Sequence, residues 1–296
     1  MILMSNLIAI RKRINSIAST IRVTKVMQMI ATAKIAKIKQ MMTVVGRYGE
    51  ETDTILQKYM HNTTMPGELK KYFSGFSTKK NVLLLLFSSD KGTCGSINTN
   101  IFKEAMHEIA EYKKNGNTVE VLPVGKKAVK WARTNCEKLG FKVYKQDAYA
   151  DAEYCDAKIV GGAVNTILEA YSSGEFSEVS ILSHRFKNII TCNTVKEKLL
   201  PIQNVAADSS KSEFINIDET DSMPQAMIEF YIRTKVYNIY VSNIASIVSS
   251  RMNAMDNATK NGQEIIDDLK IKYNKSRQAG ITAELSDIVS GFEAVN

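Results

Sequence analysis

Proline is absent from both ends of this chain. The 296-residue sequence holds four prolines, at positions 66, 123, 201 and 224, so residues 1–65 and 225–296 contain none. Proline removes a helical hydrogen bond and clashes with the preceding turn, so its absence permits long uninterrupted helices. Each end can therefore form a helix longer than a compact domain can cover.

Residues at the N-terminal end follow the three-four spacing of a coiled coil. This seam consists of Leu7, Ile10, Ile14, Ile17, Ile21 and Thr24, and it then broadens through Met27, Ile30, Ala31, Ile35, Ile38, Met41 and Met42. The pattern predicts a helix that runs to about residue 60 within an N-terminal coiled-coil segment, residues 1–62. At about 1.5 Å per residue it would be on the order of 80 Å long.

The C-terminal segment, residues 225–296, repeats the spacing with smaller residues. Its seam is Met252, Met255, Thr259, Gly262, Ile266, Leu269, Tyr273, Ser276, Gly280 and Ala283. Two long helices with one seam each most simply bury those seams against each other, as an intramolecular antiparallel coiled coil. Two-fold dimerisation through the same seams is the alternative.

Residues 63–224 have a different hydropathy pattern, in which short apolar runs alternate with amphipathic stretches. The runs predict strands at 81–87, 118–124, 141–144, 179–183 and 189–195, with helices at 97–112, 126–139 and 154–171. Alternation of this kind is typical of an open, mainly parallel α/β sheet. We therefore predict an α/β fold class: a long antiparallel coiled coil plus a central Rossmann-like domain, with its sheet at about residues 80–200.

The sequence motifs give no support for an active site. The loop at 91–95 has neither the dinucleotide glycine pattern nor the P-loop pattern, and residues 124–127 lack a hydroxyl for Mg²⁺. Four cysteines without CxxC spacing and three isolated histidines predict no metal site. We expect no catalytic residue and no cofactor, although an α/β enzyme remains an alternative.

Positive charge is concentrated at one end of the chain. Residues 1–49 contain nine Lys or Arg and no Asp or Glu, while the whole chain has a formal charge of +8. Such a segment fits a basic coiled-coil scaffold that binds nucleic acid or an anionic membrane surface. The apolar runs are too short to span a bilayer, since a span needs about 20 residues.

Five segments together resemble the gamma subunit of the F-type rotary ATP synthase. They are residues 10–17 (IRKRINSI), 21–31 (IRVTKVMQMIA), 88–95 (SSDKGTCG), 251–261 (RMNAMDNATKN) and 273–285 (YNKSRQAGITAEL). They occur in the family's order and cover both ends and the middle of the chain.

The resemblance implies a central rotor shaft rather than an enzyme in its own right. In the family, the coiled coil stands in the cavity of a hexamer of alternating alpha and beta subunits. The α/β domain holds the epsilon or delta subunit and seats on the membrane ring of c subunits. Proton flow turns the ring and shaft, which drive the beta sites through their states. Nucleic acid is then no partner, and the chain is peripheral to the membrane.

The resemblance also implies partner-binding positions. Arg277 and Gln278 match the pair that bonds the hexamer's catch loop, with Thr282 and Glu284 as neighbouring contacts. Met27 and Lys25 match positions beside the lever of the beta subunit, and Cys94 lies in a loop placed near that lever. Residues 184–187 and 256–261 resemble mitochondrial relatives more than bacterial ones. We therefore expect the matrix side of the mitochondrial inner membrane, with the cytoplasmic face of a bacterial plasma membrane as the alternative.

Overall fold

The computed structural model describes residues 2–62, 67, 69–76, 80–145, 157–203 and 223–293. By their contacts, the residues form two compact units. One comprises residues 1–32 and 251–296, and the other comprises residues 33–250. Both long terminal helices contribute to each unit, so the boundary between the units falls within the helices.

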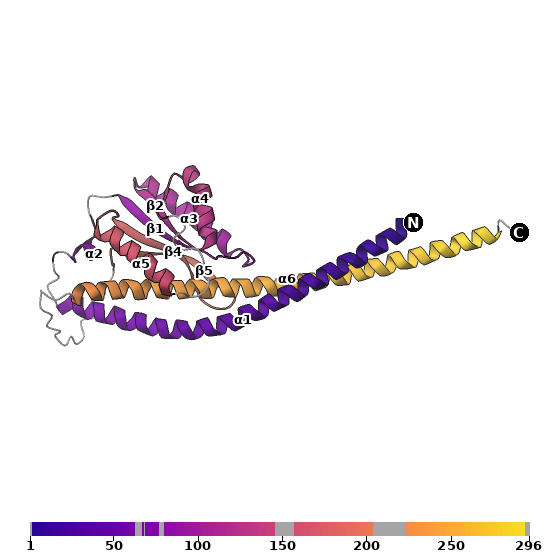
Figure 1. Cartoon of the computed structure of the whole chain (residues 1–296), viewed down its shortest axis with the longest axis horizontal. Coiled ribbons are helices and arrows are strands. Elements are labelled where there is room, and N and C mark those ends of the chain that lie inside the picture. The colour runs from indigo at the N-terminus through magenta and orange to yellow at the C-terminus, as the bar shows by residue number, and fades with distance from the viewer. Residues whose placement is uncertain are drawn as a thin grey trace. The chain divides into compact units, whose positions relative to one another are not determined.

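Helices dominate both ends of the chain and alternate with strands in the middle (Figure 1), as predicted. The elements are α1 (Ile2–Asn62), α2 (Lys71–Ser74), β1 (Asn81–Phe87), α3 (Ile97–Lys114), β2 (Thr118–Val124), α4 (Lys126–Leu139), β3 (Lys142–Val143), α5 (Ala157–Ser172), β4 (Glu178–Phe186), β5 (Cys192–Leu200) and α6 (Met223–Glu293).

The predicted boundaries of the last two strands were wrong. β4 continues to Phe186, and β5 begins at Cys192 rather than at residue 189. The apolar pair at 189–190 suggested a strand, but the Asn188 side chain accepts hydrogen bonds from the amides of Ile190 and Thr191 and fixes a turn. Residues 154–156, where the preceding helix was expected to start, lie outside the described residues.

The sheet has the order β3-β2-β1-β4-β5, and only β5 runs antiparallel to its neighbour. β1 is central, and all but the first of its residues are buried. One face packs against α3 and α4 through a cluster that includes Leu84, Ile101 and Ala128. On the other face, the ring of Phe87 lies 5.8 Å from that of Tyr240 on α6. This double cover explains the continuous apolar run of β1.

Ion pairs attach the polar edge strand β5 to the rest of the domain. Glu197 pairs with Arg185 of β4 at 2.8 Å, Lys198 pairs with Glu178 at 3.0 Å, and Lys196 pairs with Glu108 of α3. Each lysine therefore reaches a carboxylate on a different element. These pairs join the edge strand to β4 and α3 although few of its residues are buried.

His184 of β4 is a buried titratable group in this domain. It is 2% exposed, and its Nδ1 lies 3.3 Å from the Thr194 hydroxyl. Burial lowers the pKa of His184 to about 4, against a smaller opposite effect from the Ile97 backbone. The histidine is therefore neutral in the folded protein at physiological pH.

Acid should destabilise the domain through His184. The unfolded chain binds a proton below its pKa of about 6.5, whereas the folded state does so only near 4, so stability falls as the pH drops through this window. From pH 8 to pH 5 we expect a loss of about 2 kcal/mol from this group, measured by urea unfolding. His184→Gln should remove that loss, while the exposed control His107→Gln should retain it. An equal pH dependence in both variants would contradict the assignment.

Candidate partner interface

α1 and α6 pair antiparallel in the first unit. Thr24 and Thr259 join their hydroxyls at 2.8 Å, and Gln28 donates to the Asp256 carboxylate at 2.9 Å. One turn further along, a Cβ on Gly262 would lie only 2.8 Å from Cγ1 of Ile21. Partner numbers fall along α6 as they rise along α1, which confirms the predicted antiparallel coiled coil.

Charge supports the polar layer of this seam. Lys260 lies 2.7 Å from the second carboxylate oxygen of Asp256. This ammonium lowers the pKa of the Asp256 carboxyl. The carboxylate thus stays charged and available to Gln28 over a wider range of acidity.

Two residues assigned to the N-terminal seam lie outside it. Met27 is 41% exposed and Ile30 is 53% exposed, while the half-buried Gln28 and the buried Ala31 continue the three-four spacing after Thr24. The prediction chose the apolar Met27 over the neighbouring polar Gln28, and the predicted seam was therefore displaced by one position. Gln28 tolerates the seam because Asp256 satisfies its amide.

The displaced residues belong to a second apolar stripe on α1. Val23, Val26, Met27 and Ile30 are all exposed, by 41% to 55%, at spacings that place them on one face. Lys25, a predicted contact residue, is also exposed on α1. Sequence periodicity alone does not separate this stripe from the seam, because the two apolar periods are offset by a single residue.

The end of α6 exposes the other predicted contact residues. Arg277, Gln278, Thr282 and Glu284 are all exposed, and the Thr282 hydroxyl donates to the Gln278 carbonyl at 3.0 Å. Four large apolar side chains accompany them, each at least 49% exposed: Ile281, Leu285, Ile288 and Val289. Ala283, expected in the seam, is exposed instead.

Cys94 belongs to the second unit and lies in the loop between β1 and α3. Its side chain is 2% exposed and receives the Asn98 amide at 3.1 Å. A partner would therefore reach this loop through its exposed residues, such as Lys91 and Thr93. The contact predicted at Cys94 stays a prediction. It applies to the exposed residues of the loop, because the thiol itself is buried.

The sheet edge where α/β proteins commonly bind phosphates is filled by the chain itself. The first three amides of α4 donate to the Asp90 carboxylate (2.9 Å), the Ser89 carbonyl (3.1 Å) and the Ser88 hydroxyl (2.6 Å). Gly125 permits this closure, because a Cβ there would lie 2.4 Å from the Ser88 carbonyl oxygen. A helix N-terminus whose amides are already bonded offers little to a phosphate.

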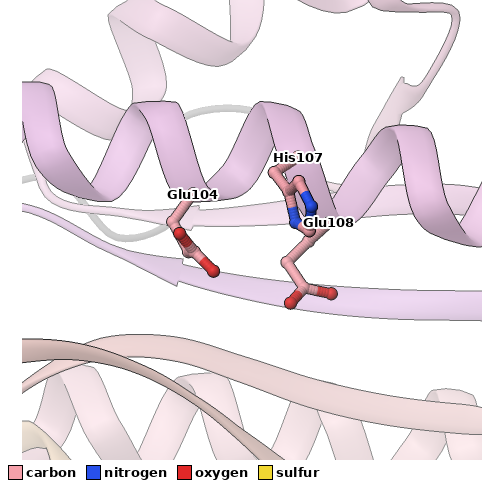
Figure 2. A group of neighbouring side chains, drawn as sticks. All are labelled: Glu104, His107 and Glu108. Carbon is pink, nitrogen blue, oxygen red and sulfur yellow. The ribbon is translucent and has the colours of Figure 1, made fainter.

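One cluster with metal-ligand chemistry occurs among the described residues, on α3 (Figure 2). Glu104, His107 and Glu108 bring one ligand atom each to within 4.8 Å of one another, so His107 is not isolated in space as the sequence suggested. However, the buried carboxylate of Glu108 already pairs with Lys196. The Lys196 ammonium supplies the positive charge that a metal ion would otherwise bring to Glu108. We therefore assign the cluster to the ion pairs of β5.

Within the described part of the chain, no helix combines the length and hydropathy required to cross a bilayer.

Comparison with known proteins identifies relatives along the full chain. A family model described as ATP synthase matches residues 6–295. The ATP synthase gamma chain of Pelagibacter ubique (strain HTCC1062) is 32% identical over 299 residues, covering 99% of this chain and all of that protein. The gamma chain of Rickettsia bellii (strain RML369-C) is 33% identical over 304 residues, with 99% of this chain and all of that protein covered.

Solved structures share the fold at lower identity. A chain of the Euglena gracilis mitochondrial ATP synthase (OSCP/F1/c-ring, rotational state 3) is 17% identical with a TM-score of 0.64, covering 98% of this chain and 95% of that one. A chain of the Tetrahymena thermophila mitochondrial ATP synthase (central stalk/c-ring) is 21% identical with a TM-score of 0.58 over 80% of this chain and 99% of that one.

Two glycines of α6 should respond oppositely to alanine. Gly280 has nothing within 4 Å of a Cβ, so Gly280→Ala should raise the free energy of unfolding by up to about 1 kcal/mol through helix propensity. Gly262→Ala is the matched control, since its methyl would press on Ile21 and cancel that gain. Urea unfolding followed by circular dichroism compares them. Equal stabilisation by both would show that the helices do not approach closely at Gly262.

Proposed function

We propose that this chain, which belongs to the gamma-chain family of ATP synthases, is the central rotor shaft of an F-type ATP synthase. In this role it couples proton-driven rotation of the c-ring to the conformational cycle of the catalytic beta subunits. It is a non-catalytic subunit, because ATP is made and hydrolysed on beta.

The observation that carries this proposal is the exposed apolar surface of the paired helices. The seam between α1 and α6 is satisfied internally, yet Val23, Met27, Ile281 and Leu285 remain exposed on the outside. A soluble helix pair gains nothing in folding from large apolar groups on its outer face. A surrounding sleeve of other subunits would bury them.

Rotation requires a shaft whose faces differ. On the outside of α1, apolar residues are interleaved with Lys25 and Arg22, whereas the end of α6 joins Arg277 and Gln278 to an apolar stripe. A beta subunit that meets one face and then the other experiences different contacts, and this difference can bias a two-state element. The asymmetry needs no change in the shaft itself.

We assign the contacts residue by residue on the family resemblance and on exposure. Arg277 and Gln278, with Thr282 and Glu284 beside them, would meet the catch loop of the hexamer. Arg277 offers a planar fork of donors suited to a partner carboxylate. Met27, Lys25 and the loop that contains Cys94 would meet the lever of beta.

The remaining partners follow from the same membership. We propose that the α/β domain binds the epsilon or delta subunit and the c-ring, as assemblies named for central stalk and c-ring among the related structures suggest. The complex is associated with a membrane, and this chain belongs to its peripheral part.

We favour the matrix side of the mitochondrial inner membrane, because residues 184–187 and 256–261 resemble mitochondrial relatives. Cell fractionation with a mitochondrial marker tests this location.

The competing function is a basic scaffold for nucleic acid or anionic membrane. It draws on the nine cations of residues 1–49, but binding to nucleic acid would leave the exposed apolar stripes without a role. The two functions differ in their response to salt.

Assembly with alpha and beta subunits should survive high salt. We expect the full chain, co-expressed with both subunits, to co-purify with them at about 50 mM and about 200 mM salt, because apolar contacts are not screened. A polyphosphate partner would lose about a thousandfold or more in affinity over this range. Failure to co-purify at either concentration, together with salt-sensitive retention of RNA or anionic vesicles, would favour the scaffold.

Arg277→Ala should lower coupled ATP turnover of the assembled complex by about tenfold, the typical effect of losing a charge-assisted hydrogen bond. Nucleotide binding to beta should stay intact, because Arg277 lies on the shaft. Arg277→Lys should recover only part of the turnover, since an ammonium lacks the fork. Lys275→Ala, an exposed cation in the same turn, is the control. Unchanged turnover in Arg277→Ala would remove the assigned role.

A further inference from the structure

The end of β4 extends past one of its partner strands and meets α6. The pairing of β4 with β1 stops at Leu182, whereas its pairing with β5 continues to Phe186. One side of the strand, at residues 183–186, is therefore left without β1 as a partner. Buried backbone amides and carbonyls need hydrogen bonds, because an unpaired one destabilises the fold. Another element has to supply them.

Side chains of α6 take the place of β1 at this strand end. The Asn243 side chain accepts the amide of His184 at 3.0 Å, and the Ser242 hydroxyl accepts the amide of Phe186 at 2.9 Å. The Ser246 hydroxyl donates to the His184 carbonyl at 3.4 Å. Three side chains of the helix thus satisfy three backbone groups of the strand.

Two further serines extend the contact to neighbouring loops. The Ser249 hydroxyl donates to the Ile189 carbonyl at 2.5 Å, in the turn between β4 and β5. The Ser250 hydroxyl donates to the Cys94 carbonyl at 2.6 Å, in the loop between β1 and α3. The five residues of α6 follow the spacing i, i+1, i+4, i+7 and i+8, which places them on one face of the helix. We call them the polar ladder: Ser242, Asn243, Ser246, Ser249 and Ser250.

The polar ladder occupies positions that apolar residues commonly fill. Asn243, Ser246 and Ser249 are at most 3% exposed, and the preceding turns of α6 bury apolar side chains such as Ile232 and Val236. Apolar packing is non-directional, so it resists the turning of a helix about its own axis only weakly. Hydrogen bonds to backbone atoms require narrow ranges of distance and angle. The ladder therefore fixes both the rotation and the axial position of α6 against the sheet.

The polar ladder also lies where α6 leaves the second unit. That unit ends at Ser250, and α6 continues from Arg251 into the first unit. Torque that passes along α6 between the domain and the coiled coil has to cross this point. The ladder extends over eight residue steps, about 12 Å of helix. Bonds distributed over this length resist both twisting and tilting of the helix.

We propose that the polar ladder is the joint that transmits torque between the α/β domain and the shaft helix α6. Its members are positioning residues, because they act by holding the helix. When the joint is weakened, the domain slips against α6, so ATP hydrolysis in the hexamer continues while less rotation reaches the c-ring. This inference rests on the proposed function, because it takes the chain as the rotor shaft.

The test uses the complete ATP synthase in inverted membrane vesicles. Ser249→Ala combined with Ser250→Ala removes two bonds of the ladder. ATP hydrolysis should stay near the rate of the unaltered complex, whereas ATP-driven proton pumping against a steep gradient should be lost. Ser250→Ala alone removes one bond and should lower the protons pumped per ATP to a smaller extent. The single variant decides the matter if the double variant does not assemble.

Ser177→Ala is the matched control. Its hydroxyl donates to the Asn81 carbonyl at 3.0 Å within the α/β domain, so its loss removes the same kind of bond without involving α6. The control should keep the normal number of protons pumped per ATP. Equal losses in the control and the ladder variants would leave the ladder a role in folding only and overturn the proposal. Normal pumping by the ladder variants would also overturn it.

Hydrogen exchange tests the joint in the full chain without assembly. In the chain with Ser249→Ala and Ser250→Ala, the amides of His184 and Phe186 keep their own acceptors. They should nevertheless exchange about fivefold faster for each lost bond, the factor typical of one hydrogen bond, because the ladder opens as a unit. Unchanged exchange would show that the bonds act separately and contradict a single joint. An unaltered complex that pumps no protons would instead refute the proposed function.

Discussion

The pairing of α1 with α6 is the constraint on which the rest depends. A helix of 61 residues and one of 71 cannot be covered by a domain of this size, so each must bury its seam on the other. The seam includes polar and small residues, with Thr24 on Thr259, Gln28 on Asp256, and Gly262 under Ile21. A slip of one residue would unpair the amide and place side chains against the glycine, so these residues specify one register. Register in turn decides which residues lie outside.

The α/β domain follows the same logic, in which the chain satisfies its own polar groups. Its parallel strands could open a phosphate site at their carboxyl ends, yet Ser88 and Asp90 bond the first amides of α4. Glu108 likewise pairs with Lys196 of β5, whereas an unpaired Glu108 could join His107 in binding a metal. In the described domain, these polar groups therefore stabilise the fold rather than bind a ligand. The exposed loops remain available to contact a partner. A fold often used for nucleotides here positions surfaces.

Much of this architecture could be predicted because it rests on periodicity. The two long helices, the strand at 81–87 and the helix at 126–139 follow from proline absence, apolar runs and turn residues. Periodicity failed where polar contacts override it. Gln28 lies in the seam because Asp256 is opposite, and that pairing of residues far apart in sequence is invisible in either helix alone. Asn188 similarly converts an apparent strand into a turn. The residues predicted to contact partners were chosen through family motifs, whereas the exposed stripe of Val23 and Val26, and the exposure of Ile190, required the structure.

The first unit departs from the usual distribution of polarity in a helix pair, although Ala31, Met255, Ile266 and Leu269 are buried as expected. Its seam includes hydroxyls, an amide and a glycine, while valine, methionine, isoleucine and leucine lie exposed beside basic residues. The two kinds of exposed residue serve different stages of association. Long-range attraction between the nine cations of residues 1–49 and carboxylates of a partner would speed association and is screened by salt. Short-range burial of the apolar stripes holds the shaft after entry and is not screened. A rotor needs this division, because diffuse attraction draws the shaft in without fixing one angle, whereas the apolar contacts distinguish one face from the next.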